Sequence, residues 1–419
     1  MSFLPKVVIM LSLSKVIAEA ARWRNFFLLT LTLLFGQIAS GFLMISLISS
    51  VFQKTGSNFS VSGIILSLTI PSLILMAAAG LAADLVDRKK LIIWANSVIA
   101  VVVVVILLTI DKVFLSIFLS FLYFAGNTFF FPAISAASAQ IVKKSQLAVA
   151  NSVFIFTLAG GQLAGLFFGS VSLFLFGHTV TLIICEVFLI AAIIIPMSLP
   201  KLLPRKPDGM TIADKIADIA KAFMYIFSAK ITWFFFFAFA AIQGVVAFGG
   251  TIGPGYFDEV VNISIEKSPM FIFPPIAIGV LFGALFVHNQ KVRKSFFIAL
   301  GLGALGFWTS LLGIIINTGL IKGIYLLFPS VIFLVFDGFG AILVMIASRT
   351  ALQQRVAHNY LGTVFGANIV LAAFFASIAS PLAAAIELFF GYINILIFGG
   401  LSFLAVSAVI GYVGKRWNF

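Results

Sequence analysis

Apolar residues along this chain are gathered into twelve long runs, which short polar segments separate. A run of roughly 20 apolar residues can cross a bilayer as an α-helix, because a helix satisfies its own backbone hydrogen bonds there. The pattern therefore predicts a membrane protein of many crossings. We expect the twelve spans at residues 26–50, 60–82, 91–110, 113–138, 149–175, 179–198, 231–252, 271–287, 296–316, 323–347, 364–386 and 391–413.

Basic residues are confined to the chain ends and to the segments between runs. If both termini are cytoplasmic, 22 of the 26 lysines and arginines lie on the inner side of the membrane. The four that remain outside are Lys54, Lys112, Lys267 and Lys322. Cytoplasmic loops carry such an excess of positive charge, so the bias supports both the number of spans and their orientation.

Composition agrees with this class, since 62% of residues are hydrophobic, 9% are charged and the mean hydropathy is +1.21. The net charge of +13 is explained by loops that face anionic lipid, so we expect the lipid bilayer as a partner and no nucleic acid. Cys185 is the only cysteine, which excludes disulfides. The three histidines are far apart in the sequence, so no metal site is expected.

A polar stretch at residues 201–230 separates two groups of six spans. Within it, Thr211 followed by Asp214 resembles a capping box that opens an amphipathic helix. A faint internal repeat between the two groups is typical of transporters built by duplication. We predict a cytoplasmic amphipathic N-terminal segment (1–25), an N-terminal six-helix bundle (26–200), a cytoplasmic linker (201–230), a C-terminal six-helix bundle (231–414) and a cytoplasmic tail (415–419).

The segment after the second span carries the most specific motif, formed by Gly80, Asp84, Asp87, Arg88 and Lys89. The positive-inside bias accounts for the cations but not for the two acids. The pattern resembles the signature loop of the major facilitator superfamily. This resemblance implies a conformational gate, in which the glycine lets two helices approach, the acid lies at a helix N-terminus and the cations bind across the cytoplasmic seam.

Three further segments, residues 55–74, 129–154 and 351–366, resemble the bacterial exporter branch that includes macrolide and siderophore efflux proteins. The resemblance extends from about residue 25 to the C-terminus. It implies the major facilitator fold, an all-α polytopic membrane protein with twelve transmembrane helices in two six-helix pseudo-repeat bundles. It also implies a functional monomer in the bacterial plasma (inner) membrane.

The chain departs from that branch at several positions. Leu85 and Thr363 stand where arginine is usual, so some ion pairs of the inner gate are missing. In the fifth span, Leu166 replaces the proline of an antiporter motif, although Gly165 and Gly169 are kept and are expected to pack helices together. The lost proline weakens the argument for obligate antiport.

Only two of the thirteen acids, Glu186 and Asp337, lie deep within predicted spans. A charge at the bilayer centre costs about 2.5–3.5 kcal/mol on insertion scales, so acids there are usually retained for a pathway, a relay or a partner. Two interpretations remain: a neutral acid that hydrogen-bonds a neighbouring helix, or a proton-coupling residue. Asp337 is the stronger coupling candidate because it adjoins Gly338 and lies near Gly340.

Uncharged polar residues at mid-span are candidates for lining a substrate cavity, and interhelical hydrogen bonding is the alternative for each. They are Gln37, Asn127, Gln162, Gln243 and Asn368. Charged side chains do not cluster at mid-span, and the chain has 49 phenylalanines. A lipophilic or amphipathic substrate is therefore favoured over a small, highly charged metabolite.

These observations predict a secondary active transporter that exports a drug, macrolide or siderophore-like molecule by alternating access. A proton gradient is the expected energy source, without a cofactor or enzymatic activity. A lysophospholipid flippase or a nutrient importer of the same superfamily is the alternative. A membrane-embedded lipid-linked transferase is remote, since Asp258, Glu259 and Glu266 in the longest outer loop lack glycine-rich or metal-ligand spacing.

Overall fold

A computed structural model describes residues 24–142, 146–203, 211–228, 232–287, 293–356 and 361–417. Nearly all of the predicted N-terminal segment and parts of the predicted linker lie outside these ranges. The described elements are α2 (Arg24–Thr55), α3 (Asn58–Leu85), α4 (Arg88–Thr109), α5 (Val113–Ile141), α6 (Leu147–Met197), α7 (Ile212–Ser228), α8 (Thr232–Glu259), α9 (Ser268–Val287), α10 (Lys294–Thr318), the short η2 (Gly323–Leu326), α11 (Leu327–Arg355) and α12 (Leu361–Trp417).

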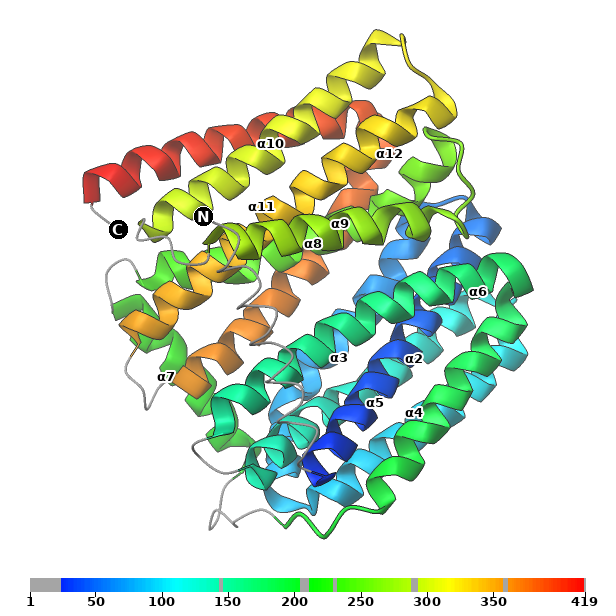
Figure 1. Ribbon diagram of the computed structural model, residues 1–419, viewed down its shortest axis with the longest axis vertical. Coiled ribbons are helices and arrows are strands. Elements are labelled where there is room, and N and C mark those ends of the chain that lie inside the picture. Colours follow the sequence, from blue (N-terminus) through cyan, green and yellow to red (C-terminus); the bar gives the residue numbers. More distant parts are fainter. Residues whose placement is uncertain are drawn as a thin grey trace, which may run out of the picture. The chain divides into compact units, whose positions relative to one another are not determined.

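Ten of these helices are long and apolar enough to cross a membrane. Two of the ten, α6 and α12, turn back on themselves (Figure 1). The turns contain Gly177 (φ 75°, ψ −177°) and Gly391 (φ 71°, ψ 166°), whose backbone angles are not helical. Because each turn divides a helix into two arms, the described residues contain twelve apolar helical segments. This is consistent with the predicted number, and the predicted all-α class is confirmed.

Large apolar side chains cover much of the described surface. Leu108, Phe114 and Phe389 are each more than three-quarters exposed. A soluble protein rarely exposes so many large apolar side chains, whereas a helix that faces lipid gains by doing so. The described helices thus carry both the length and the surface of membrane-spanning elements.

The chain forms two compact units, each with its own core. The first unit comprises Met1–Leu47 and Ile74–Ile212, and the second comprises Ile48–Leu73 and Ala213–Phe419. The hairpin Ile48–Leu73, made by the end of α2 and the first half of α3, therefore packs with helices of the second unit.

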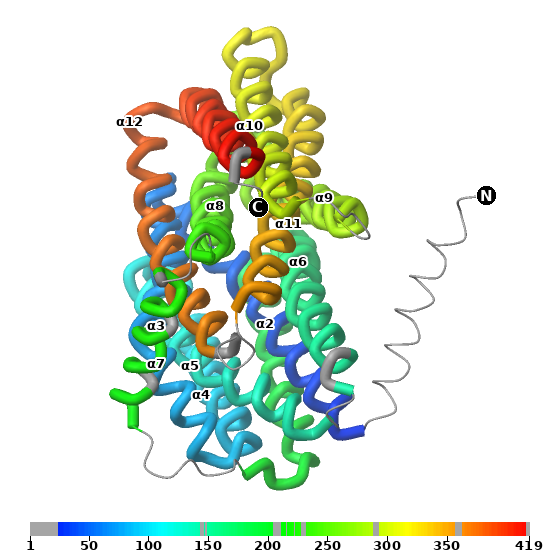
Figure 2. The backbone as a smooth tube through the Cα atoms, turned by 90° about the vertical axis from the view of Figure 1, so that its left-hand side faces the viewer, coloured from blue at the N-terminus to red at the C-terminus, as the bar shows by residue number. Residues whose placement is uncertain are grey.

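The core cluster of the first unit joins α2, the end of α3, α4, α5 and the segment after α6, and the first arm of α6 packs against it. The paths of these helices can be followed in Figure 2. Close approach of α2 to α6 depends on glycine. A Cβ atom at Gly165 would overlap the backbone of Ile38, and one at Gly169 would lie 2.9 Å from Cα of Phe42. Backbones can approach this closely only where the side chain is absent, as in other small-residue helix contacts in membranes.

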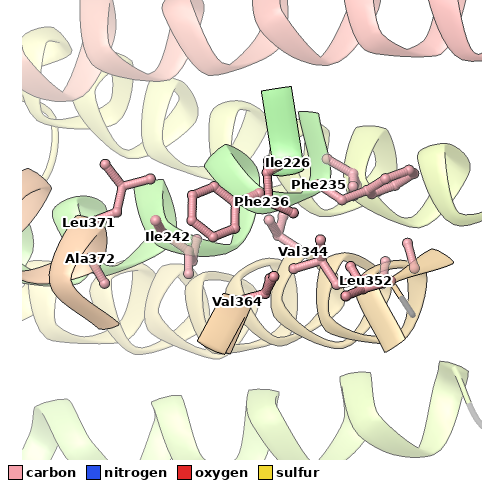
Figure 3. Packing of buried hydrophobic residues seen from close by; sticks show 14 of the residues in the cluster. Ile226, Phe235, Phe236, Ile242, Val344, Leu352, Val364, Leu371 and Ala372 are labelled. Carbon is pink, nitrogen blue, oxygen red and sulfur yellow. The ribbon is translucent and has the colours of Figure 1, made fainter. Parts of the chain in front are cut away.

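One core cluster of the second unit joins α8, α10, α11 and the first arm of α12, and Figure 3 shows part of it. Phe236 on α8 packs in a cluster with Val344 on α11 and Val364 on α12. Helix α7 follows Thr211 directly and places Ile226 in the same cluster with no exposed surface. The predicted amphipathic helix is therefore present in the linker and is anchored to the second unit.

The Gly177 turn leads to a prediction for stability. Its combination of positive φ and extended ψ is essentially restricted to glycine, and other residues pay about 1–3 kcal/mol to adopt it. No described atom lies within 4 Å of a Cβ at Gly177, so Gly177→Ala introduces only backbone strain. We expect thermal unfolding of the detergent-solubilised variant to occur at a lower temperature than that of the wild type.

Gly160→Ala is the matched control, because Gly160 lies in the same helix with helical φ and an equally open Cβ position. Alanine is a better helix former than glycine, so this change should be neutral or stabilising. Equal destabilisation by both variants would contradict a special role for the turn.

Candidate functional site

The α3–α4 turn is organised by the carboxylate of Asp87. Asp87 is the N-cap of α4, and its Oδ1 accepts a hydrogen bond from the backbone N–H of Lys89 at 3.0 Å. A carboxylate in this position satisfies one of the free N–H groups and faces the positive end of the helix dipole. Asp87 is buried, with 7% of its surface exposed, so this cap is shielded from solvent.

The same carboxylate holds the segment that follows α6. Oδ1 of Asp87 also accepts from the backbone N–H of Leu202 at 3.0 Å. The backbone N–H of Arg88 in turn donates to the carbonyl oxygen of Leu202 at 3.1 Å. Leu199 and Leu202 are buried in the core of the first unit. The first residues of the linker are therefore fixed to the α3–α4 turn by polar bonds and by apolar burial.

Lys89 caps the C-terminus of α6 from a different helix. Its Nζ donates to the carbonyl oxygens of Met197 and Leu199, both at 2.6 Å. Helix α6 ends at Met197, where carbonyl groups lose their intrahelical partners. A lysine at this point satisfies these acceptors and opposes the negative end of the dipole.

Arg88 connects the turn to α5. Its Nη1 donates to Oε1 of Gln140 at 2.7 Å, and its Nη2 lies 4.0 Å from Oδ1 of Asp84. The Gln140 amide then donates to the carbonyl oxygen of Leu203 at 3.0 Å. We call Asp84, Asp87, Arg88, Lys89 and Gln140 the turn network. It joins the ends of α3, α4, α5 and α6 to the start of the linker.

The turn network differs in detail from what the sequence resemblance implied. The acid at a helix N-terminus is Asp87, whereas Asp84 lies one residue before the end of α3. Within its own unit, a Cβ at Gly80 would meet no described atom within 4 Å, so Gly80 is not a close-packing residue there. Gln140 and the carbonyl groups at the end of α6 were not predicted as members. Backbone acceptors leave no signal in a sequence.

Asp337 lies where α11 makes its closest contacts. A Cβ at Gly338 would overlap the backbone of Ile276 on α9, and one at Gly340 would lie 2.5 Å from the carbonyl oxygen of Gly301 on α10. Half-buried Asp337 shares a helix face with Ser330, seven residues earlier. The Ser330 hydroxyl lies 2.8 Å from that of Tyr256 on α8, so this face is turned toward α8.

Glu186 lies in the second arm of α6, which packs against α2. The preceding residue, Cys185, is fully buried, and its Sγ donates to the carbonyl oxygen of Ala39. Oε2 of Glu186 is buried without a hydrogen-bond partner among the described residues. A buried carboxylate oxygen without a partner is costly in the charged state. This makes Glu186 a stronger candidate for proton binding than its sequence position suggested.

Asn368 forms an interhelical bond within the second unit. Its Nδ2 donates to the carbonyl oxygen of Phe236 at 2.8 Å, which ties α12 to α8. Asn368 is 3% exposed. The sequence left open whether Asn368 lines a substrate cavity or forms an interhelical hydrogen bond. The structure shows an interhelical hydrogen bond.

The other uncharged polar candidates are spread over both units. Gln37 is buried on α2, where a Cβ at Gly161 would lie 2.9 Å from its own Cβ. Asn127 and Gln162 are half-buried in the first unit, and Gln243 is exposed in the second. Among the described side chains of each unit, these residues form no hydrogen bonds with one another.

Most of the chain matches one known protein family. The profile of the Major Facilitator Superfamily matches residues 26–381. No curated protein sequence matches the chain significantly.

The solved structures that resemble the chain include three membrane transporters. A mutant of the nucleoside transporter NupG has a TM-score of 0.72 at 13% identity and covers 94% of this chain and 99% of its own. A POT family transporter in complex with 5-aminolevulinic acid has a TM-score of 0.74 at 11% identity, covering 94% and 96%. A bacterial homologue of the human lysosomal transporter Spinster has a TM-score of 0.69 at 14% identity, covering 94% and 97%. At these identities the likeness concerns the fold.

The turn network predicts unequal effects of its two acids on stability. Asp87→Ala removes an N-cap, a loss that costs about 0.5–2 kcal/mol, and also the bond to Leu202. Asp84→Asn removes one partner of a solvent-accessible ion pair, which contributes about 0–1 kcal/mol. We expect the thermal unfolding temperature of the purified protein to fall clearly for Asp87→Ala and little for Asp84→Asn. The reverse order would show that the cap does not hold this end of the unit.

Proposed function

Because this chain belongs to the Major Facilitator Superfamily, we propose that it is a secondary active transporter that exports a lipophilic or amphipathic small molecule. Export is coupled to proton entry and proceeds by alternating access. The substrate class that we favour includes drugs, macrolides and siderophore-like compounds.

The observation that carries the transport proposal is the division of the chain into two separately packed units. Alternating access in such folds requires bundles that move largely as rigid bodies. Each unit here has its own buried cluster, centred on Ile92 and Phe130 in the first and on Phe236 and Val344 in the second. Close packing within each cluster supports movement of its helices as a body, because packed cores resist continuous deformation. Neither cluster includes a residue of the hairpin Ile48–Leu73.

The turn network supports a gate at the inner end of the first unit. The network fixes the end of α6 to the α3–α4 turn, and it also fixes Leu202, in the first residues of the linker, to the same turn. A displacement of this turn would therefore be transmitted to the linker. The gate that we propose comprises Asp84, Asp87, Arg88 and Lys89, with Gln140 as an additional positioning residue.

The proposed substrate class is supported by what the helices carry at mid-span. The polar candidates there are amides such as Gln37, Gln162 and Gln243, and phenylalanine is abundant. Sites for small molecules are mostly apolar with a few polar groups that fix orientation. Such a surface suits an amphipathic cargo better than a multiply charged one.

Uptake into everted vesicles or proteoliposomes, with an imposed pH difference, tests the function directly. The panel comprises lipophilic drugs, macrolides, siderophores, lysophospholipids and nucleosides. Accumulation of a lipophilic compound driven by protons moving in the opposite direction would support the proposal. If only lysophospholipid moves, the protein is a flippase and not a drug exporter. If a nutrient moves in the same direction as the proton, the protein is an importer.

Proton coupling leads to a prediction for Asp337. Asparagine mimics the protonated acid, so Asp337→Asn should bind cargo and exchange it passively but lose accumulation against a gradient. Transport by the variant should also become insensitive to the imposed pH difference. Both properties are measured in the same vesicle assay as net accumulation and as counterflow of labelled cargo.

Glu186→Gln is the comparison for this prediction, since Glu186 is the other acid deep in a span. We expect a smaller loss of accumulation than for Asp337→Asn. If Asp337→Asn keeps wild-type pH-driven accumulation and Glu186→Gln loses it, the coupling residue lies in the first unit. The unpaired oxygen of Glu186 would then be its structural basis.

The proposed orientation leads to a topology prediction. A reporter fused after Lys206 or after Phe419 should report the cytoplasm, and one inserted near Glu266 or Thr318 should report the exterior. Paired enzymatic and fluorescent fusions, each active on one side only, make the measurement. A cytoplasmic signal near Glu266 would contradict the twelve-span topology.

A further inference from the structure

The hairpin Ile48–Leu73 is held to its unit by polar contacts along its length. Gln53 donates to the carboxylate of Glu266. Further along, the hydroxyl of Ser377 on α12 donates to that of Thr69 at 2.7 Å. Between these two points, apolar Ile65 packs against α8 and α12.

At the N-terminus of α3, the hairpin joins a hydrogen-bonded chain that contains two carboxylates. Nδ2 of Asn58 donates to Oε2 of Glu387 at 3.1 Å and to the hydroxyl oxygen of Tyr392 at 2.7 Å. The Tyr392 hydroxyl donates to Oε1 of Glu259 at 3.4 Å. We call Asn58, Glu259, Glu387 and Tyr392 the hairpin cluster. None of its members was assigned a role from the sequence.

The backbone is shaped to bring these side chains together. Glu387 and Tyr392 lie on opposite sides of the Gly391 turn, and Glu259 is the last residue of α8. A Cβ at Gly255 would lie 2.7 Å from Oδ1 of Asn58 and would also overlap the Tyr392 hydroxyl. The absence of a side chain at Gly255 therefore makes room for the cluster.

One polar atom of the hairpin cluster is left unsatisfied. Asn58 is 3% exposed, and its Oδ1 has no hydrogen-bond partner among the described residues. Oδ1 of Asn58 and the Tyr392 hydroxyl oxygen both lie beside Gly255, where an added Cβ atom would overlap them. A buried acceptor without a donor is costly. The cluster as a whole therefore lacks one hydrogen-bond donor, and a proton bound to one of its carboxyl groups would add one.

The charges around the cluster are unbalanced. Glu387 and the adjacent Asp258 both repel a charge on Glu259. Within the described residues, neither Glu259 nor Glu387 has a lysine or arginine within 4.0 Å. The charged groups on the surrounding segments are Lys54 at the end of α2, Asp258 in the last turn of α8, Glu266 and Lys267 between α8 and α9, and Lys322 before η2.

We infer that Glu259, beside the charge of Glu387, is a proton-binding site that controls whether the hairpin Ile48–Leu73 stays attached to α8 and α12. One bound proton relieves the repulsion and keeps the hydrogen-bonded chain intact. Loss of that proton leaves two charges without a cation, and separation of the hairpin exposes both to water. The attached state binds the proton more tightly, so low pH favours attachment and rising pH favours release.

This inference rests on the alternating access proposed above, in which the hairpin lies at the external end of the protein. The site would sense the external pH and open the transporter outward when that pH rises. It is distinct from Asp337 and Glu186, because it regulates the opening of one end and need not carry the transported proton.

A cysteine beneath the cluster can report hairpin release. Ser62 is 1% exposed and lies one turn after Asn58. The variant Ser62→Cys is made in a chain that also carries Cys185→Ser. Its thiol should react with an impermeant maleimide only after the hairpin is released. Thr55→Cys, at an exposed position, gives the rate for a free thiol at each pH. We expect the normalised rate to rise about tenfold between about pH 5.5 and about pH 8.5.

Substitutions of the acids test the assignment. The double variant Glu259→Gln with Glu387→Gln should label slowly at every pH, because neither side chain can then carry a charge. Glu387→Gln alone removes the repelling charge and should shift the midpoint. Asn58→Ala should label quickly even at low pH. Glu266→Gln is the matched control, since Glu266 also binds the hairpin, through Gln53, but lies outside the cluster. It should keep the pH dependence.

A wild-type rate that does not change with pH overturns the inference. The inference is also overturned if the double variant keeps the pH dependence of labelling. It is overturned again if Glu266→Gln loses this pH dependence while the double variant does not. The labelling requires no substrate, so its outcome is separate from that of the transport assay. pH-dependent labelling in a protein that moves none of the panel would sustain the hairpin site and reject the proposed substrate class.

Discussion

Helix ends impose the strictest constraint on a chain of this kind. Along an apolar span the backbone satisfies its own hydrogen bonds, but the first N–H groups and the last carbonyl groups of every helix must find other partners. In the first unit, Asp87 accepts from the start of α4 and Lys89 donates to the end of α6. The same two residues position the segment that leaves the unit, so helix capping and placement of the linker's start use one set of atoms.

Close contact between helices depends on small residues rather than on apolar area. Apolar side chains gain little by leaving lipid for another apolar surface, so backbone approach and directional bonds contribute much of the association. Gly165 on α6 and Gly338 on α11 meet facing backbones, and Asn368 bonds a carbonyl group on α8. Asp337 adjoins one such contact, which explains how an acid can be held at a defined position between tightly packed helices.

Much of the fold could be predicted from the apolar runs, because run length and charge placement reflect the bilayer directly. The gap between the runs 149–175 and 179–198 contains Gly177, and the run at 391–413 starts at Gly391, where the structure has its turns. The turn network was predicted only in part, since Met197 and Leu199 contribute backbone oxygens. The hairpin cluster was not predicted. Asn58 and Tyr392 are 334 positions apart, and each reads as an ordinary residue near a span end.

The single-glycine turns of α6 and α12 have a consequence for biosynthesis. The arms of α6 are separated by Gly177, with only His178 and Thr179 as polar residues directly after it. A nascent chain must move the connection between two spans across the bilayer, and the cost of this transfer rises with the number of polar groups in the connection. A connection this short carries few polar groups, so the cost of moving it across the bilayer is low. The turn that shapes the mature unit would thereby also ease its entry into the membrane.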